Sequence, residues 1–398
     1  MVSFSVLNTQ THDVLKQFMT EIHEDEVKLS GLDSRFLSDR RELAKKSGVV
    51  ARQCFNLLAR HVNRQAGKIC VPRIVHPAVL ALRESIGIQT VDVQNLVLSA
   101  LGTGEFERSD MDQAIELARE VNAYHIDLFG KITDAQLRRI AEIRSLRSIH
   151  FHSASFPESS LIHLAQHEKL HSISITRCDS MTDKALLLLG KIQSLEHLDL
   201  SYCYHITGVG LRHIRQLRRL NLSCCYNLTD DGITALSGLE NLRCLNLSRN
   251  THSIRDKHLV QIAKLKNLTS LDLSNCWKLC KLEPLAALKS LTFLNLSKNM
   301  SIRFEEFRYL ARLIELEWLG LSRCEHLTDQ NLKYLESLNR LKSLDLSECC
   351  NVTDKGIEHL TGLNLKHLDI GGCRNLTAKK IAALKRVKAI DLPDLVEV

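Results

Sequence analysis

The 398-residue chain has little of what marks several large protein classes. Aromatic residues make up 5% of it, and it has only five prolines and 17 glycines. This proline and glycine content excludes collagen-like and low-complexity chains, while 44% hydrophobic and 25% charged residues exclude a disordered one. No stretch approaches the roughly 18 uninterrupted apolar residues of a membrane span, so we expect no membrane association.

The chain also shows no secretory signal at its start. Residues 1–13 lack both the basic segment and the long apolar segment of a signal peptide. Thirteen cysteines are nevertheless present. In a long chain without such a signal, reduced thiols are favoured over disulfides, so we expect a cytoplasmic location.

Signatures of common catalytic sites are missing as well. The sequence has no GxxxxGK[ST], GxGxxG or GxSxG motif and no paired CxxC pattern for zinc. We therefore predict that the protein is not an enzyme and uses no cofactor. One enzymatic alternative stays open, in which Cys54 or Cys70 in the first part of the chain is a nucleophile.

Histidines provide the candidate metal ligands. His163 and His167 are four apart on an expected helix but lack the HExxH context of a zinc site. His150 and His152 are expected on the same side of one strand, near His171 on the next. No carboxylate or thiol is evident at a matching spacing, and we therefore predict no metal site.

What the chain has in excess is leucine. Of 69 leucines, 17 lie in residues 1–150 and 52 in the remaining 248. The excess comes from ten copies of a pattern close to LxxLxLSxC, with degenerate copies at Ile126 and Ile390. Steps of 22 to 26 residues separate their central apolar positions, which are Ile149, Ile173, Leu198, Leu220, Leu245, Leu271, Leu294, Leu319, Leu344 and Leu368.

Each copy predicts the same structural unit. Leucines that alternate with polar residues indicate a short strand with one buried face. A cysteine or asparagine follows at a fixed place, where a small buried side chain can satisfy backbone groups as the chain turns. A Thr-Asp pair then predicts the start of a helix, as at Thr182, Thr229, Thr328 and Thr353. Because one unit cannot bury its own face, the units must stack, with parallel strands inside and helices outside.

These motifs resemble the leucine-rich repeat family, in particular its cysteine-containing subclass with the signature LxxLxLSxCxxLTDxGLxxL. NLSCCYNLTDDGITAL, residues 221–236, and DLSECCNVTDKGIEHL, residues 345–360, are similar to it almost letter for letter. The resemblance covers roughly residues 123–392. It implies an α/β solenoid, a horseshoe of about 10–12 repeats with a parallel concave sheet and convex helices. Near Cys280–Pro284 and Met300–Phe304 the Thr-Asp pair is missing, and we expect irregular or shorter convex segments there.

The concave face of such a horseshoe is the candidate binding surface. Phe293 and Trp318 are expected side by side on neighbouring strands, and Gly320 leaves space beside Trp318. Exposed aromatic residues near arginines are typical of interface hot spots. The alternative is that the two rings merely pack on each other or on a terminal segment. The predicted protein-binding residues are Phe293, Trp318, Arg249, Lys298, Arg323, Arg219, His197 and His367. The Asp/Asn residue after each central leucine belongs to the family consensus, so we interpret that column as structural.

Residues 1–122 have helical periodicity without the repeat, which predicts a small α-helical domain before the repeat domain 123–398. It caps the first repeat or has a more specific role. Residues 36–58 resemble the second half of an F-box, with the motif's apolar positions at Leu37, Leu43, Val49, Val50 and Phe55. That resemblance implies a substrate receptor that binds the adaptor of a cullin-type ubiquitin ligase, although the Leu-Pro opening is absent.

We therefore predict a non-enzymatic recognition protein whose concave face binds a protein partner. The net charge of +7 is spread thinly, which suits an acidic protein surface at least as well as nucleic acid, and we expect no nucleic-acid binding. A monomer is expected. Because bacterial effectors also carry repeats of this kind, delivery into a host cell is a further possibility for the location.

Overall fold

The structure is a computed structural model that describes residues 111, 112, 115, 118, 119, 123–377, 379 and 380. The chain forms two compact units, Met1–His150 and Phe151–Val398. The predicted domain boundary after residue 122 stays a prediction. In the first unit, residues 111, 112, 115, 118 and 119 are helical, as the helical periodicity of residues 1–122 predicts. Residues 1–110 lie outside the described residues. No helix in the described part of the chain is both long and apolar enough to cross a membrane.

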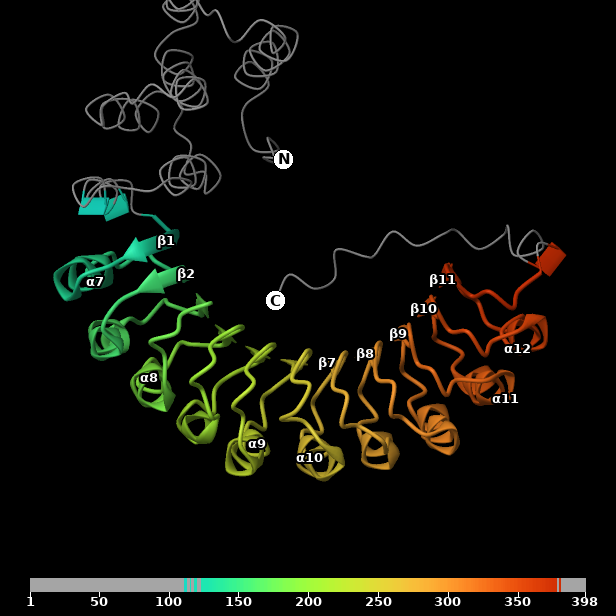
Figure 1. The fold of residues 1–398 in the computed structure, drawn as a ribbon. Coiled ribbons are helices and arrows are strands. Elements are labelled where there is room, and N and C mark those ends of the chain that lie inside the picture. Colours follow the sequence, from blue (N-terminus) through green and yellow to red (C-terminus); the bar gives the residue numbers. More distant parts are fainter. Residues whose placement is uncertain (1–110, 113–114, 116–117, 120–122, 378, 381–398) are drawn as a thin grey trace, which may run out of the picture. The chain divides into compact units, whose positions relative to one another are not determined.

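The strands form a sheet in which each strand's neighbours in sequence are also its neighbours in space (Figure 1). The described strands are β1 His125–Lys131, β2 Ser148–Ser155, β3 Ser172–Thr176, β4 His197–Asp199, β5 Arg219–Asn221, β6 Cys244–Asn246, β7 Ser270–Asp272, β8 Phe293–Asn295, β9 Trp318–Gly320, β10 Ser343–Asp345 and β11 His367–Asp369. Strands β3 to β11 pair in parallel, and the central leucines lie in register, as Leu220 does with Leu245. This confirms the predicted α/β solenoid of leucine-rich repeats.

Most convex segments are α-helical where the Thr-Asp pair is present and 3₁₀-helical where it is missing, and α10 is the exception because Arg255 precedes its first residue. The α-helices are α7 Asp134–Ala141, α8 Asp183–Leu189, α9 Asp230–Leu236, α10 Asp256–Ile262, α11 Asp329–Leu332 and α12 Asp354–Glu358. The 3₁₀ helices are η3 Glu158–Gln166, η4 Val209–His213, η5 Glu283–Ala287, η6 Phe304–Arg312 and η7 Lys333–Ser337. Thr229 shows the expected capping, since its Oγ1 accepts a hydrogen bond from Gly232 N at 3.2 Å. The predicted irregular segments near 280–284 and 300–304 are confirmed as the 3₁₀ helices η5 and η6.

Buried thiols hold successive repeats together at the turn after each strand. The thiol of Cys225 donates to the carbonyl oxygen of Leu200 in the preceding repeat, with a sulfur–oxygen distance of 3.1 Å. Cys349 does the same with Leu321 at 3.1 Å. Where asparagine replaces cysteine, the amide takes over this role, as Asn250 Nδ2 donates to Leu222 O at 2.8 Å. The predicted role of this position in satisfying backbone groups is thus confirmed.

A second set of contacts joins the repeats on the convex side. The carboxylate of Asp329 accepts hydrogen bonds from Thr353 N at 2.7 Å and from Thr353 Oγ1 at 2.6 Å. Asp354 accepts the equivalent pair from Thr377 one repeat later. The aspartate of the Thr-Asp pair therefore lies in the first turn of its own helix, where a negative charge is favourable, and also fixes the position of the next repeat.

Candidate protein-recognition surface

In the unit Phe151–Val398, the strands lie on the inner side of an arc and the helices on its outer side (Figure 1). Each three-residue strand buries its central leucine, so the flanking side chains belong to the opposite, concave face. The predicted residues His197, Arg219, Phe293, Trp318 and His367 stand at equivalent positions on β4, β5, β8, β9 and β11. The sheet therefore places all five on one face, but it spreads them over several repeats instead of gathering them in one pocket.

Phe293 and Trp318 are in direct contact on this face. Their rings are stacked, with centroids 4.3 Å apart and an interplanar angle of 10°. Phe293 is half-buried, but Trp318 is only 6% exposed, so the expectation of an exposed tryptophan is wrong. The two rings instead pack on each other, as the alternative prediction states. The indole Nε1 of Trp318 is buried and has no hydrogen-bond partner among the described residues.

Gly320 explains how the indole can lie flat on the sheet. A Cβ atom at Gly320 would approach Cη2 of Trp318 and Oδ1 of Asn295 to 2.6 Å each. The predicted space beside Trp318 is therefore real, and the tryptophan fills it. Phe293 is therefore the more accessible of the two rings.

The column of aspartates and asparagines on the same face has the predicted structural role. Asp272 Oδ1 accepts a hydrogen bond from Ser274 N at 2.8 Å, and Asn246 Oδ1 accepts one from Ser248 N at 2.9 Å. Burial raises the pKa of Asp272, although hydrogen bonds from Ser274 and Asn295 counteract this. These side chains close the turn at the end of each strand and leave few polar groups for a ligand.

The three predicted basic residues at the loop edge share one backbone position. Arg249, Lys298 and Arg323 are exposed and have positive φ angles of 61°, 64° and 55°. Each directly precedes the buried cysteine or asparagine, where the chain turns off the strand. Arg323 Nη2 lies 2.6 Å from Glu348 Oε1, whereas Arg249 Nη1 lies 3.3 Å from the Tyr202 hydroxyl. The sheet thus repeats basic groups along one edge, with Arg323 partly neutralised.

His197 and Arg219 lie side by side on β4 and β5 in the sheet register. Burial and the positive charge of Arg219 lower the pKa of His197. The imidazole therefore stays neutral near pH 7, and Arg219 is the charged group of this pair.

Sequence reasoning missed an exposed row of large side chains. Four of the residues that directly follow a buried cysteine or asparagine are large, namely Tyr204, Tyr226, Trp277 and Met300, and they are 38%, 46%, 47% and 41% exposed. We call these four residues the edge row. Thr251 occupies this position between Tyr226 and Trp277. The rings of Tyr204 and Tyr226 stack with centroids 5.6 Å apart, and His252 packs edge-on against Trp277 at 6.2 Å. Their fixed position after the buried cysteine or asparagine was the available signal.

The histidine prediction also needs correction. His150 does have a carboxylate partner, because Asp127 Oδ1 lies 3.3 Å from His150 Nδ1. His152 and His171 do not take part: the ring of His152 contacts Thr176 Oγ1 and that of His171 contacts Lys169 O. Burial raises the pKa of Asp127, but hydrogen bonds and charge from His125 and His150 outweigh it and hold the pKa far below its usual range.

The predicted adaptor-binding residues, Leu37, Leu43, Val49, Val50 and Phe55, lie outside the described residues. The same holds for Cys54 and Cys70, the candidate nucleophiles. Both interpretations of the first part of the chain therefore stay predictions.

Comparison with known families agrees with this architecture. Residues 186–276 match the family described as Zer-1-like, leucine-rich repeats, and residues 337–360 match a leucine-rich repeat family. The chain is therefore a leucine-rich repeat protein. Its assignment to the cysteine-containing subclass stays a prediction. No curated protein sequence matches the chain.

Solved structures share the fold at low sequence identity. A structure of the yeast Rad7–Elc1 complex is similar with a TM-score of 0.56 and 17% identity, over 83% of this chain and 89% of that one. Internalin C2 from Listeria monocytogenes matches with a TM-score of 0.42 and 22% identity, over 55% of this chain and 84% of that one. At these identities the likeness concerns the fold alone.

Proposed function

We propose that the protein is a non-enzymatic recognition scaffold that binds a partner protein through the edge row and the adjoining concave face. The edge row carries the proposal. Its four side chains are large, exposed and repeated along one edge, while the core of every described repeat is complete without them. Tyrosine and tryptophan are the residues that dominate protein interfaces, because they bury much area at a small cost in side-chain entropy.

Charges beside the edge row indicate the kind of partner. The guanidinium of Arg177 lies 4.8 Å from the ring centroid of Tyr202, and Arg249 contacts the hydroxyl of the same tyrosine. Both arginines are exposed. Exposed aromatic rings next to guanidinium groups that a tyrosine holds in place favour a partner surface that carries carboxylates.

A capture experiment with paired variants tests this function. The full-length chain is immobilised and exposed to a cytosolic extract, and the double variant Tyr226→Ala/Trp277→Ala is compared with wild type. We expect the double variant to capture at least tenfold less of the partner than wild type does. Tyr334→Ala is the matched control, because Tyr334 is a 38% exposed aromatic residue on the convex 3₁₀ helix η7. Equal capture by wild type and the double variant, or an equal loss in the control, contradicts the proposal.

A second candidate is a substrate receptor of a cullin-type ubiquitin ligase. It is favoured by the resemblance of residues 36–58 to an F-box followed by repeats of this kind. In that case Val50→Glu and Phe55→Glu abolish copurification of the ligase adaptor, while the edge-row variant keeps the adaptor and loses the substrate. Unchanged adaptor copurification in both glutamate variants removes this candidate.

We further propose that the protein acts as a cytoplasmic monomer and binds no nucleic acid. All eleven cysteines of the described residues are free, and buried ones such as Cys225 and Cys349 act as hydrogen-bond donors, which suits a reducing compartment. The basic residues of the repeats are interspersed with acidic partners, as in the pair Lys342–Glu317. Binding to single- or double-stranded nucleic acid at low salt, weakening steeply as salt rises, would contradict this part of the proposal.

A further inference from the structure

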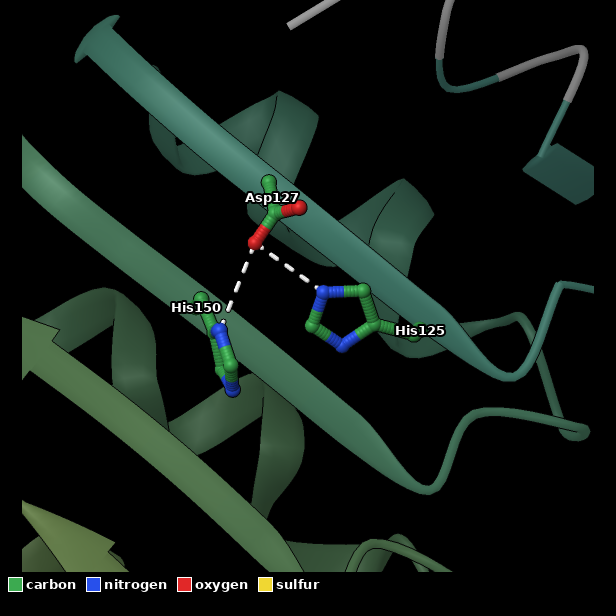
Figure 2. A group of neighbouring side chains, drawn as sticks. All are labelled: His125, Asp127 and His150. Carbon is green, nitrogen blue, oxygen red and sulfur yellow. Dashed lines mark hydrogen bonds and ion pairs between the residues drawn. The ribbon is translucent and has the colours of Figure 1, made fainter. Parts of the chain in front are cut away.

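Three side chains of the first unit converge on one point outside the hydrophobic core (Figure 2). His125 and Asp127 alternate with buried residues along β1, so both side chains leave the same face of the strand. His150 comes from β2, where it also alternates with buried neighbours. Within the described part of the chain, this is the one group of three histidine, cysteine or acidic residues close enough to share a metal ion.

The distances in this group are those of a ligand set. His125 Nε2 lies 3.0 Å from Asp127 Oδ1, and His150 Nδ1 lies 3.3 Å from the same oxygen. One ligand atom from each residue lies within 4.8 Å of the other two. Tetrahedral zinc with bonds of about 2.0–2.1 Å places its ligand atoms about 3.3 Å apart, so small side-chain shifts suffice to bring all three into coordination.

A supporting contact orients one of the imidazoles. Nδ1 of His125 lies 2.6 Å from Ser148 Oγ, which leaves Nε2 directed at Asp127. Histidine ligands of metal sites usually have such a partner on the second ring nitrogen, because it holds the ring orientation. The two imidazole rings are also held against each other edge-to-face, with centroids 4.4 Å apart.

The three side chains are partly buried but remain accessible to solvent. The side chains of His125, Asp127 and His150 are 21%, 33% and 44% exposed. An ion can therefore enter, and three protein ligands leave at least one coordination position for water or for a group of a bound molecule. Two imidazoles with one carboxylate suit zinc and related transition ions better than calcium or magnesium, which prefer oxygen ligands.

We propose that His125, Asp127 and His150 form a binding site for a divalent transition-metal ion, with Zn²⁺ as the preferred occupant. The proposal does not depend on the recognition function. It adds a metal site on the face of the sheet where the repeats begin. Zn²⁺ replaces the carboxylate–imidazole contacts as the link between β1 and β2, and occupancy thereby stabilises this end of the repeats.

The test uses the full-length protein with its thiols kept reduced and its metal removed by a chelator. Zn²⁺ is titrated by calorimetry, and Co²⁺ is titrated by its visible absorption. We expect one Zn²⁺ per chain that is lost or weakened at least tenfold in Asp127→Asn and in His150→Ala. Asp127→Asn keeps the size of the side chain and its capacity to accept a hydrogen bond, so the folded state is retained.

His359→Ala is the matched control. His359 Nδ1 lies 2.6 Å from Glu336 Oε1, and this histidine–carboxylate pair has no third ligand among the residues that the structure describes. This control is expected to bind Zn²⁺ as wild type does, and Zn²⁺ is expected to raise the melting temperature of wild type and His359→Ala but not of Asp127→Asn. Equal affinity in wild type, Asp127→Asn and His150→Ala overturns the proposal. An equal loss in His359→Ala also overturns it, because binding would then be a general property of surface imidazoles.

Discussion

Phe293 and Trp318 are stacked on neighbouring strands, with ring centroids 4.3 Å apart, and the phenyl ring covers the indole. Because of this contact, the two expected binding residues form one structural element in which only Phe293 is partly exposed. It depends on Gly320 at the end of the strand that carries Trp318, since a side chain there would occupy the space of the indole.

Replacement of Gly320 by alanine is expected to displace the indole and lower the free energy of unfolding by about 1–3 kcal/mol, as overpacking does elsewhere. The measurement is urea unfolding followed by tryptophan fluorescence in a Trp277→Phe background, which leaves Trp318 as the reporter. Gly362→Ala is the control, because a Cβ there has no neighbour within 4 Å. Identical emission and stability in Gly320→Ala and Gly362→Ala would show that the indole does not lie over Gly320.

The buried cysteines are expected to resist thiol reagents until the repeats unfold. In the native protein Cys350 is exposed and should react rapidly with a chromogenic disulfide, whereas Cys225, Cys276 and Cys349 should not. The check is to count the thiols modified with and without denaturant and to locate them by mass spectrometry. In Cys350→Ser the fast phase should decrease by one thiol, and rapid labelling of Cys276 in the native protein would argue against the described packing.

Stability should fall steeply in alkaline solution. Burial raises the pKa of Cys225 and of Cys349 to about 12, from 9.0 for the free thiol. Between these values the unfolded chain releases thiol protons that the folded chain retains, so the stability these thiols provide below pH 9 is lost as the pH rises towards 12. Each such thiol costs up to about 1.4 kcal/mol per pH unit in that window.

The measurement is urea unfolding at a series of pH values from about 8 up to the highest pH at which the chain still refolds reversibly. Lysines and tyrosines titrate in the same region, so the comparison is with Cys225→Ala/Cys349→Ala. That variant is expected to be less stable at pH 8 but to lose stability less steeply above pH 9. Parallel curves for the two proteins would refute the protonation mechanism.

The convex hydrogen bonds of Asp329 should contribute to cooperativity between repeats. Asp329→Ala removes the acceptor for Thr353 N and Thr353 Oγ1, and we expect a loss of about 1–3 kcal/mol in the free energy of unfolding. Hydrogen exchange should also quicken for α12. Gln330→Ala, an exposed position on the same helix α11, serves as the control and should change stability by less than about 0.5 kcal/mol. If both variants unfold alike, the contact does not join the repeats.

Local patterns predicted most of the repeat fold. The alternating leucines, the cysteine or asparagine after them and the Thr-Asp pair act within one repeat or between adjacent ones, so the position of Cys225 or Thr229 in the sequence already implies its contacts. Even the 3₁₀ helices η5 and η6 follow from a missing Thr-Asp pair. The candidate site was less predictable, because the exposure of a surface side chain depends on how it packs against its neighbours.

By itself, the sequence determined that the leucine excess after residue 150 builds stacked strands and helices, because a repeated core position can be filled only by stacking. Only the tertiary structure decided which surface side chains stay exposed. Trp318 is buried because Gly320 gives it room, whereas Tyr226 and Trp277 stay exposed because the turn carries them away from the core. The approach of His125 and Asp127 to His150 likewise depends on strand pairing, which brings together residues more than twenty positions apart.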